Sequence, residues 1–260
     1  TGTDNTWIGS NAGVGASGNS NSFNTGVGSD ALLGITTGNY NVAVGSRCAD
    51  ALTDGHQNVF VGDFAGSTTT SVGFATAVGH GAMGSGNVTS AADGTVAIGS
   101  TTLENLTTGA RNTAVGYGSA SKLTTGSDNT SLGYNAYLSQ NAGHGNHLGG
   151  SHNTFIGSAS GDGAYASTTA VENMTAVGSN ALSGALEGAA NGAVAIGKSA
   201  LAGLTSGADC LAIGHQALDA NTTASNNLAI GRDALGDLNH ANSVRNIAIG
   251  AYSGDGMGTL

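Results

Sequence analysis

Three histidines that lie close together have the clearest capacity for chemistry in this chain. His144, His147 and His152 fall within nine residues, and imidazole nitrogens are common ligands of zinc and other transition metals. No cysteine or carboxylate lies among them to complete a ligand set. We therefore interpret them as histidines of a solvated loop rather than a metal centre, and we predict neither a metal ion nor a cofactor.

Tyrosines surround this histidine cluster. Tyr134 and Tyr137 precede it, and Tyr165 follows it. A tyrosine ring can stack on the face of a sugar or anchor a protein contact through its amphipathic side chain. We take these tyrosines and the three histidines as candidate receptor-binding residues; the alternative is that the tyrosines only cover the edge of the fold.

Sequence motifs give no case for catalysis. The chain has no Gly-x-Ser-x-Gly element and no Cys-x-x-Cys pair, and its one Gly-x-x-x-x-Gly-Lys match, residues 192–198, falls on a marker of the repeat described below. A chance Gly-x-Gly match carries no weight in so glycine-rich a sequence, and the sixteen acidic residues are scattered. We therefore predict that the protein is not an enzyme.

The composition of the chain argues against several classes of binding partner. The 260 residues include 46 Gly and no Pro, with 8% charged residues and a formal net charge of −10. A basic strip that could follow phosphates is absent, which argues against nucleic-acid binding and against docking on anionic membranes. No apolar run approaches the roughly 20 residues that span a bilayer, so we predict no membrane insertion.

A short marker recurs from one end of the sequence to the other and organises it. Its form is Asn-x-Ala-(Val/Ile/Leu)-Gly, and seven of its thirteen intervals are 17 residues long, while the others are 19 to 24. This regularity predicts one folded repeat domain over residues 1–260, with longer corner insertions within 134–177. The closing glycines are Gly9, Gly28, Gly45, Gly62, Gly79, Gly99, Gly116, Gly133, Gly157, Gly178, Gly197, Gly214, Gly231 and Gly250.

The residues before each closing glycine alternate in size. In the coil that ends at Gly45, Val42 and Val44 are branched while Ala43 between them is small. Such alternation is the period of a β-strand, and the run is too short for a helix. Threonine stands nine residues before Gly in all seven 17-residue intervals, and Asn stands four before in five of them. The threonines are Thr36, Thr53, Thr70, Thr107, Thr124, Thr205 and Thr222.

We interpret each unit as one coil with two short strands and two tight corners, with Gly and Asn in the left-handed conformations that corners require. Stacked coils predict an all-β fold, a parallel β-solenoid or β-roll of about fourteen short coils. The threonine column is then a structural ladder between coils. An ice-binding rank of threonines is the alternative, although the column two residues further on is mostly Gly.

Two further expectations concern contacts. Cys48 and Cys210 lie too far apart in the repeat register for a disulfide, so we expect both to be small buried apolar residues. The column of small residues beside the branched column indicates that both strand faces are covered, one inside the coil and one by another chain, which small residues allow to approach closely. We therefore expect a homotrimer.

The repeat resembles a known pattern. Segments such as Asn112-Thr113-Ala114-Val115-Gly116 and Asn227-Leu228-Ala229-Ile230-Gly231 are similar to the head repeats of trimeric autotransporter adhesins of the YadA type and to repeats of phage tail-fibre proteins. That resemblance covers nearly the whole chain and implies a trimeric parallel β-roll that attaches cells or virions to surfaces.

From the resemblance we expect a non-catalytic segment of a phage tail fibre or of a bacterial surface adhesin. It would be extracellular and would bind a surface glycan or protein receptor. A purely structural filament subunit and an ice-binding solenoid are the alternatives.

Overall fold

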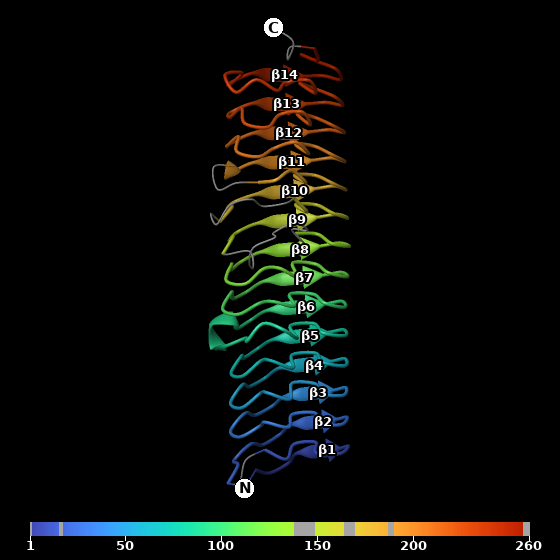
Figure 1. Cartoon of the computed structure of the whole chain (residues 1–260), viewed down its shortest axis with the longest axis vertical. Helices are drawn as coiled ribbons and strands as arrows, with labels where there is room; N and C mark the ends of the chain where they lie inside the picture. Colours follow the sequence, from blue (N-terminus) through green and yellow to red (C-terminus); the bar gives the residue numbers. More distant parts are fainter. Residues whose placement is uncertain (1, 16–17, 138–148, 164–169, 187–189, 257–260) are drawn as a thin grey trace. The chain divides into compact units, whose positions relative to one another are not determined.

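The structure is a computed structural model that describes residues 2–15, 18–137, 149–163, 170–186 and 190–256. The chain divides into two compact units, residues 1–128 and residues 129–260. Each unit is a parallel β-solenoid, and in each unit the strands stack in sequence order (Figure 1).

Every strand is three residues long and ends immediately before a closing glycine of the repeat. The strands of the first unit are β1 (Thr6–Ile8), β2 (Thr25–Val27), β3 (Val42–Val44), β4 (Val59–Val61), β5 (Thr76–Val78), β6 (Val96–Ile98) and β7 (Thr113–Val115). Those of the second unit are β8 (Thr130–Leu132), β9 (Thr154–Ile156), β10 (Thr175–Val177), β11 (Val194–Ile196), β12 (Leu211–Ile213), β13 (Leu228–Ile230) and β14 (Ile247–Ile249). A 3-10 turn, η1 (Ser90–Ala92), lies in the longer coil before β6.

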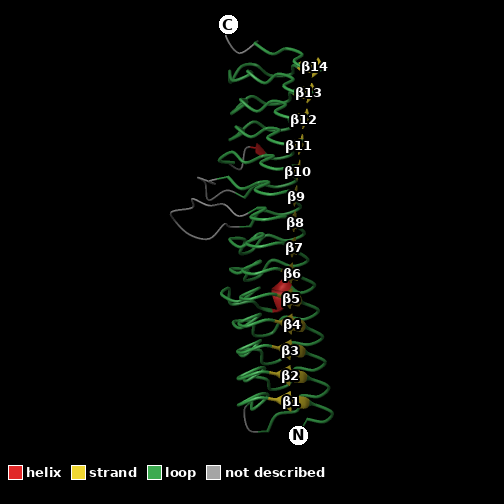
Figure 2. Cartoon of the chain, turned by 90° about the vertical axis from the view of Figure 1, so that its right-hand side faces the viewer, coloured by secondary structure: helices red, strands yellow, loops and turns green. Residues whose placement is uncertain are grey.

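Neighbouring strands pair in parallel with equivalent repeat positions opposite one another. Val42 of β3 faces Val59 of β4, and Ala43 faces Phe60. The same register holds in the second unit, where Ala212 of β12 faces Ala229 of β13. Figure 2, turned by 90°, shows the strands of each unit aligned one above another. The predicted parallel β-solenoid and its strand positions are therefore confirmed.

The prediction of two strands in each coil was wrong, because the described part of each coil contains one. The segment after each strand is interrupted by left-handed residues such as Arg47 (φ 48°) and Ala49 (φ 50°). A residue at such a φ cannot continue an extended strand. The coils still hydrogen-bond to one another there, for example from the Thr36 amide to the Thr53 carbonyl at 2.8 Å.

Two residues of each coil face each other across its interior: the middle residue of the strand and the residue four positions after the closing glycine. A large side chain at one of these positions is accompanied by a small one at the other. Ala43 is fully buried, whereas Phe60 in the next coil is large and also fully buried. Opposite Phe60 stands Gly66, where a Cβ atom would lie 2.6 Å from Phe60 Cδ1. Where one of these two positions holds a large side chain, the other is therefore small, as close packing requires.

The asparagine column differs from its predicted role. The left-handed corner residue is the one before it, such as Tyr40 (φ 60°), while Asn41 is fully buried. Asn41 Nδ2 donates to Asn24 Oδ1 (3.0 Å) and to the carbonyl of Gly55 (2.8 Å), and Asn41 Oδ1 accepts from Asn58 Nδ2 (2.9 Å). These side chains form a buried hydrogen-bonded ladder that joins successive coils.

Both cysteines are free thiols and buried. Burial raises the pKa of the Cys48 thiol to about 12, so this side chain stays protonated and unreactive at neutral pH. The Cys48 thiol donates to the Phe60 carbonyl at 3.3 Å. Both cysteines therefore lie in the coil interior, as expected from the sequence.

The Asn41→Ala substitution tests the buried ladder. It removes the donor to the Gly55 carbonyl and the acceptor of the Asn58 amide, and an unsatisfied buried polar group costs about 1–3 kcal/mol. We expect the free energy of unfolding, measured by urea titration, to fall by about 2–3 kcal/mol. The exposed Thr37→Ala change is the control and should alter it by less than about 0.5 kcal/mol. Equal losses in the two variants would contradict the ladder's role.

Candidate binding surface

In each unit the first and third residues of the strands form a continuous outward face, which we call the outer strand face. The middle residues point inward and are buried, whereas their neighbours are partly exposed. In the first unit the outer strand face comprises Thr6, Ile8, Thr25, Val27, Val42, Val44, Val59, Val61, Thr76, Val78, Val96, Ile98, Thr113 and Val115. In the second unit it comprises Thr130, Leu132, Thr154, Ile156, Thr175, Val177, Val194, Ile196, Leu211, Ile213, Leu228, Ile230, Ile247 and Ile249.

This face carries no charged residue and is apolar apart from its threonines. Val44, Ile98 and Ile196 are among its exposed side chains. The expectation that small residues would face another chain was wrong, because the alanine column lies inside the coil, where it lets opposite sides approach. The branched residues are therefore the ones that face outward.

One edge of the outer strand face is formed by the residue two positions before each strand, and we call this set the corner column. All of its members have a left-handed backbone, with φ between 53° and 77°. In residues 1–128 they are Asp4, Phe23, Tyr40, Gln57, Phe74, Gly94, Arg111 and Asp128; in the second unit they are His152, Asn173, Gly192, Asp209, Asn226 and Arg245. Gly, Asn and Asp suit this conformation, whereas a bulky residue bears a cost of roughly 1–2 kcal/mol.

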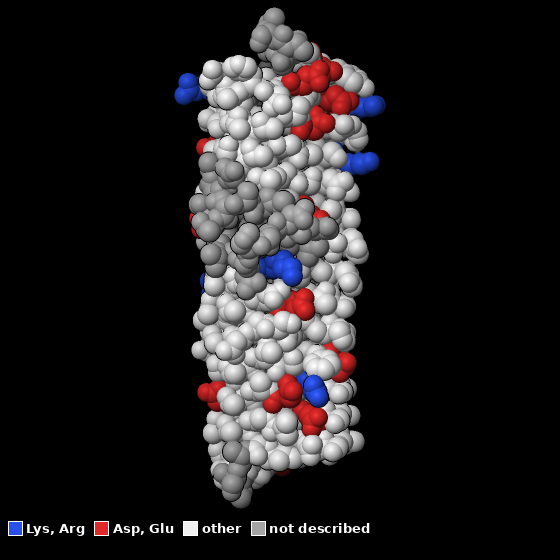
Figure 3. Space-filling model, viewed as in Figure 1, with Lys and Arg blue, Asp and Glu red and all other residues white. Residues whose placement is uncertain are grey.

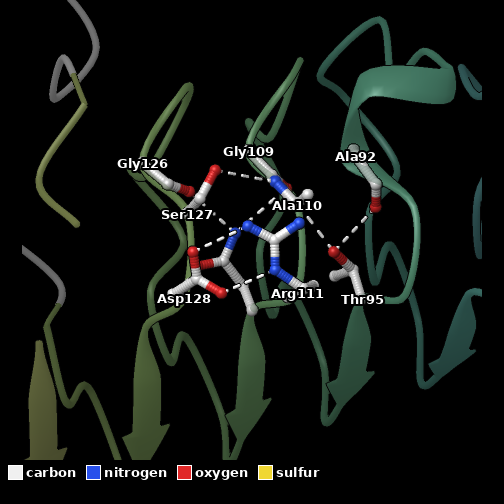
Figure 4. Close-up of polar contacts among 9 residues, drawn as sticks. Ala92, Thr95, Gly109, Ala110, Arg111, Gly126, Ser127 and Asp128 are labelled. Atoms are coloured by element: carbon white, nitrogen blue, oxygen red, sulfur yellow. Dashed lines mark hydrogen bonds and ion pairs between the residues drawn. The ribbon is translucent and has the colours of Figure 1, made fainter. Parts of the chain in front are cut away.

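Side chains in the corner column meet their equivalents in the next coil. Arg111 Nε lies 2.7 Å from Asp128 Oδ1 and Arg111 Nη2 lies 2.8 Å from Asp128 Oδ2, which makes a bidentate ion pair (Figure 4). The hydrogen bond and the charge of Asp128 raise the pKa of Arg111. The backbone beside this pair is held by a hydrogen bond from the Ala110 amide to Ser127 Oγ at 3.1 Å.

Aromatic side chains occupy the same column elsewhere in the first unit. The rings of Phe23 and Tyr40 are parallel within 4°, with centroids 4.9 Å apart. The ring of Phe74 makes an edge contact with His56, with centroids 5.1 Å apart. Phe23, Tyr40 and Phe74 are 48%, 57% and 55% exposed. No motif in the sequence singled them out, but their shared position before the Asn column could have identified them.

Two of the predicted receptor-binding residues lie on the surface. Tyr134 directly follows Gly133 and is 59% exposed. His152 is an exposed member of the corner column, two residues before β9. Tyr134 lies beyond the end of β8, and β8 pairs in parallel with β9, so the two side chains lie at opposite ends of neighbouring strands. They do not form one cluster.

Tyr137 requires a correction, because it is a core residue and only 3% exposed. Its ring stacks on Phe155 with centroids 4.6 Å apart, and burial raises the pKa of its hydroxyl group. It stands four residues after Gly133, the position that Leu182 and Leu201 fill in other coils. The small Ser131 occupies the middle of β8 and leaves room for the ring. That spacing was a signal that could have assigned Tyr137 to the interior.

His144, His147 and Tyr165 lie outside the described residues. Within the described ranges, no group of three or more His, Cys, Asp or Glu side chains is placed to hold a metal ion. The part of the chain that the structure describes also contains no helix long and apolar enough to cross a membrane.

The threonine column is engaged inside the fold. Thr36 Oγ1 donates to the Thr53 carbonyl at 2.9 Å, and Thr205 Oγ1 donates to the Thr222 carbonyl at 2.9 Å. Thr53, Thr70 and Thr107 donate in the same way to the coil that follows. Their hydroxyl groups therefore link coils and do not present a free rank to a ligand or to ice.

Charge is sparse on the face of the molecule that Figure 3 shows. Figure 3 shows acidic and basic side chains separated by wide uncharged areas on the face in view.

Comparison of the chain with models of protein families, with curated proteins and with solved structures gave no match. The interpretation of the outer strand face therefore depends on its own geometry and chemistry.

The loss of stability on substitution distinguishes Tyr137, a core residue, from Tyr134, a surface residue. Tyr137→Ala empties a buried site beside Phe155, and aromatic-to-alanine changes in cores cost about 3–5 kcal/mol. We expect that loss in the free energy of unfolding, measured by denaturant titration. Tyr134→Ala should change stability by about 0.5 kcal/mol or less. A stable Tyr137→Ala protein would contradict the assignment of this ring to the core.

Proposed function

We propose that this chain is a non-catalytic segment of an extracellular attachment fibre, either a phage tail fibre or a bacterial surface adhesin. In this proposal it assembles as a homotrimer. The observation that carries the proposal is the outer strand face, an uncharged row of Val, Ile, Leu and Thr side chains that repeats on every strand of both units. Extended apolar surface of this kind marks an interaction site in soluble proteins.

The chemistry of the face favours burial against copies of itself. Branched side chains at regular spacing give a firm surface, and association would remove many partly exposed groups from water at once. Three copies meeting at these faces agree with the resemblance of the repeat to trimeric adhesin heads. Charged and aromatic side chains of the corner column would remain at the rim, which suits the ordinary arrangement of an interface.

Attachment would then arise from repetition. Three parallel chains present each corner side chain three times, and linked weak contacts gain avidity without any new interaction. Tyr134 and His152 are exposed residues that such a receptor contact would use, and the receptor would be a surface glycan or a protein.

The mass of the purified chain in solution tests the assembly. Light scattering should give about three times the chain mass of 25.0 kDa. The double change Val44→Asp and Ile98→Asp places charge on the outer strand face and should yield monomers, because a buried unpaired charge is costly. Thr37→Asp with Thr108→Asp adds the same charge at exposed positions away from that face and should leave the mass unchanged. A monomeric natural chain would contradict the proposed assembly.

The attachment itself is tested with the fluorescently labelled chain on a panel of bacterial and animal cells. Saturable labelling of a subset of the cells is expected, and the same subset should be labelled less by the monomeric double variant because avidity is lost. Failure to label any cell of the panel above background would contradict the attachment role.

A further inference from the structure

The corner column of the first unit contains an aromatic set that the core does not use. Phe23, Tyr40 and Phe74 occupy three of four successive coils, and about half of each side chain is exposed. Their φ values are 59°, 60° and 57°, in a region that bulky residues rarely adopt. The Asn173 and Asn226 residues of the second unit show that the same corner can be built with a residue suited to it. Corner geometry therefore does not account for the aromatic side chains.

These rings stand on a firmly held backbone. The amide groups of Phe23, Tyr40 and Phe74 donate to carbonyls of the preceding coil at 3.1 Å in each case, namely those of Thr3, Ser22 and His56. Asn39 Oδ1 accepts from the Ser22 amide at 2.7 Å. Fixed aromatic rings lose little conformational freedom when a ligand binds, which favours their use as contact platforms.

The polar surroundings indicate the charge of the ligand. Exposed Gln57 lies between Tyr40 and Phe74 in the column, and exposed His56 contacts Phe74. Charged groups at the two ends of this stretch are acidic: Asp4 precedes Phe23 by one coil, and Asp93 Oδ1 accepts from the Gly73 amide beside Phe74 at 2.7 Å. Acidic groups at these positions disfavour phosphate, sulfate and nucleic acid. Neutral hydrogen-bonding groups beside aromatic rings suit the hydroxyl groups and apolar face of a sugar.

We propose that the aromatic corner column, defined as Phe23, Tyr40, Gln57 and Phe74 with His56, binds a neutral linear glycan that lies along the stack of coils. The faces of the Phe23 and Tyr40 rings lie against each other, so a ligand along the stack would meet the exposed ring edges. Its repeating sugar units match this repeating set of contacts, whereas a compact ligand would need a pocket. Gln57 and His56 supply hydrogen bonds to sugar hydroxyl groups. This inference rests on the proposed attachment function and names the class of receptor for one surface of it.

The test uses the full chain with neutral hexasaccharides of the cello-, chito- and malto- series, and heparin as the anionic comparator. Binding is followed by saturation-transfer difference NMR and by affinity electrophoresis in gels that contain the matching neutral polysaccharide. We expect at least one neutral series to bind, with saturation transferred to the sugar protons when the aromatic protons of Tyr and Phe are irradiated, and heparin not to bind.

The decisive variant is Tyr40→Asn with Phe74→Asn, because asparagine suits the left-handed corner and the fold should persist. We expect this variant to lose about tenfold or more in affinity, the loss typical of an interface anchor. Tyr117→Ser removes another exposed tyrosine of the first unit and replaces it with the residue found there in several coils, such as Ser46 and Ser100. This control should bind as the natural chain does.

The outcomes separate this inference from the proposed function. Absence of binding to every neutral series, or equal binding by the Tyr40→Asn, Phe74→Asn variant, overturns the glycan site even where the chain is trimeric and labels cells. Conversion of that variant to monomers also overturns it, because the column would then belong to the contact between chains. Glycan binding by a monomeric natural chain would support the site while contradicting the proposed trimer.

Discussion

The structure depends on one constraint, which is that each coil stacks on the next with equivalent residues in register. At Gly45 the backbone has φ +144°, and a Cβ atom there would lie 2.3 Å from the Gly62 carbonyl oxygen. Only glycine fits both this conformation and this approach. The in-register strand pairs follow from the same close stacking. The closing glycine is therefore the most regular mark of the repeat because it sets the distance between coils.

Stacking in register also decides which polar groups the interior can hold. An asparagine above an asparagine can donate and accept along the stack, so that Asn24, Asn41 and Asn58 satisfy one another. Where the ladder stops, the next residue is apolar and only its backbone takes part: the Ala75 amide donates to Asn58 Oδ1 at 2.8 Å. The Oδ1 side of such a column can therefore end on a backbone amide. At the other side an amide group is left over: Cys210 precedes Asn227 in the column, and Asn227 Nδ2 is buried without a hydrogen-bond partner.

The strands could be predicted from the sequence because side-chain size alternates before each closing glycine and this local pattern recurs along the chain. The spacing of the glycines also predicted the register between coils. The sequence did not indicate which strand face points inward, since a small residue fits equally well against the opposite side of a coil or against another chain. Tyr137 was misplaced for a related reason: its chemistry suggests a binding residue, and only its column, filled by Leu182 and Leu201 in other coils, places it in the core. The aromatic corner column was missed because its members are separated by 17 or 34 residues and only stacking brings them together.

The same constraint accounts for the low charge of the chain. Equivalent outward positions lie about 4.8 Å apart in stacked strands, and like charges at that spacing repel one another. Some charged neighbours in the described coils are paired by sign, as in Arg111 with Asp128, and other neighbours are paired by aromatic contact, as in Phe23 with Tyr40. Where two acids are neighbours the repulsion is felt: burial and the charge of Asp233 raise the pKa of Asp219. The low charge content is thus a consequence of in-register stacking, in addition to being an argument against nucleic-acid and anionic-membrane partners. It follows that surface features of such a fold arise as columns of neighbouring coils, so its binding sites are best sought in columns rather than in isolated pockets.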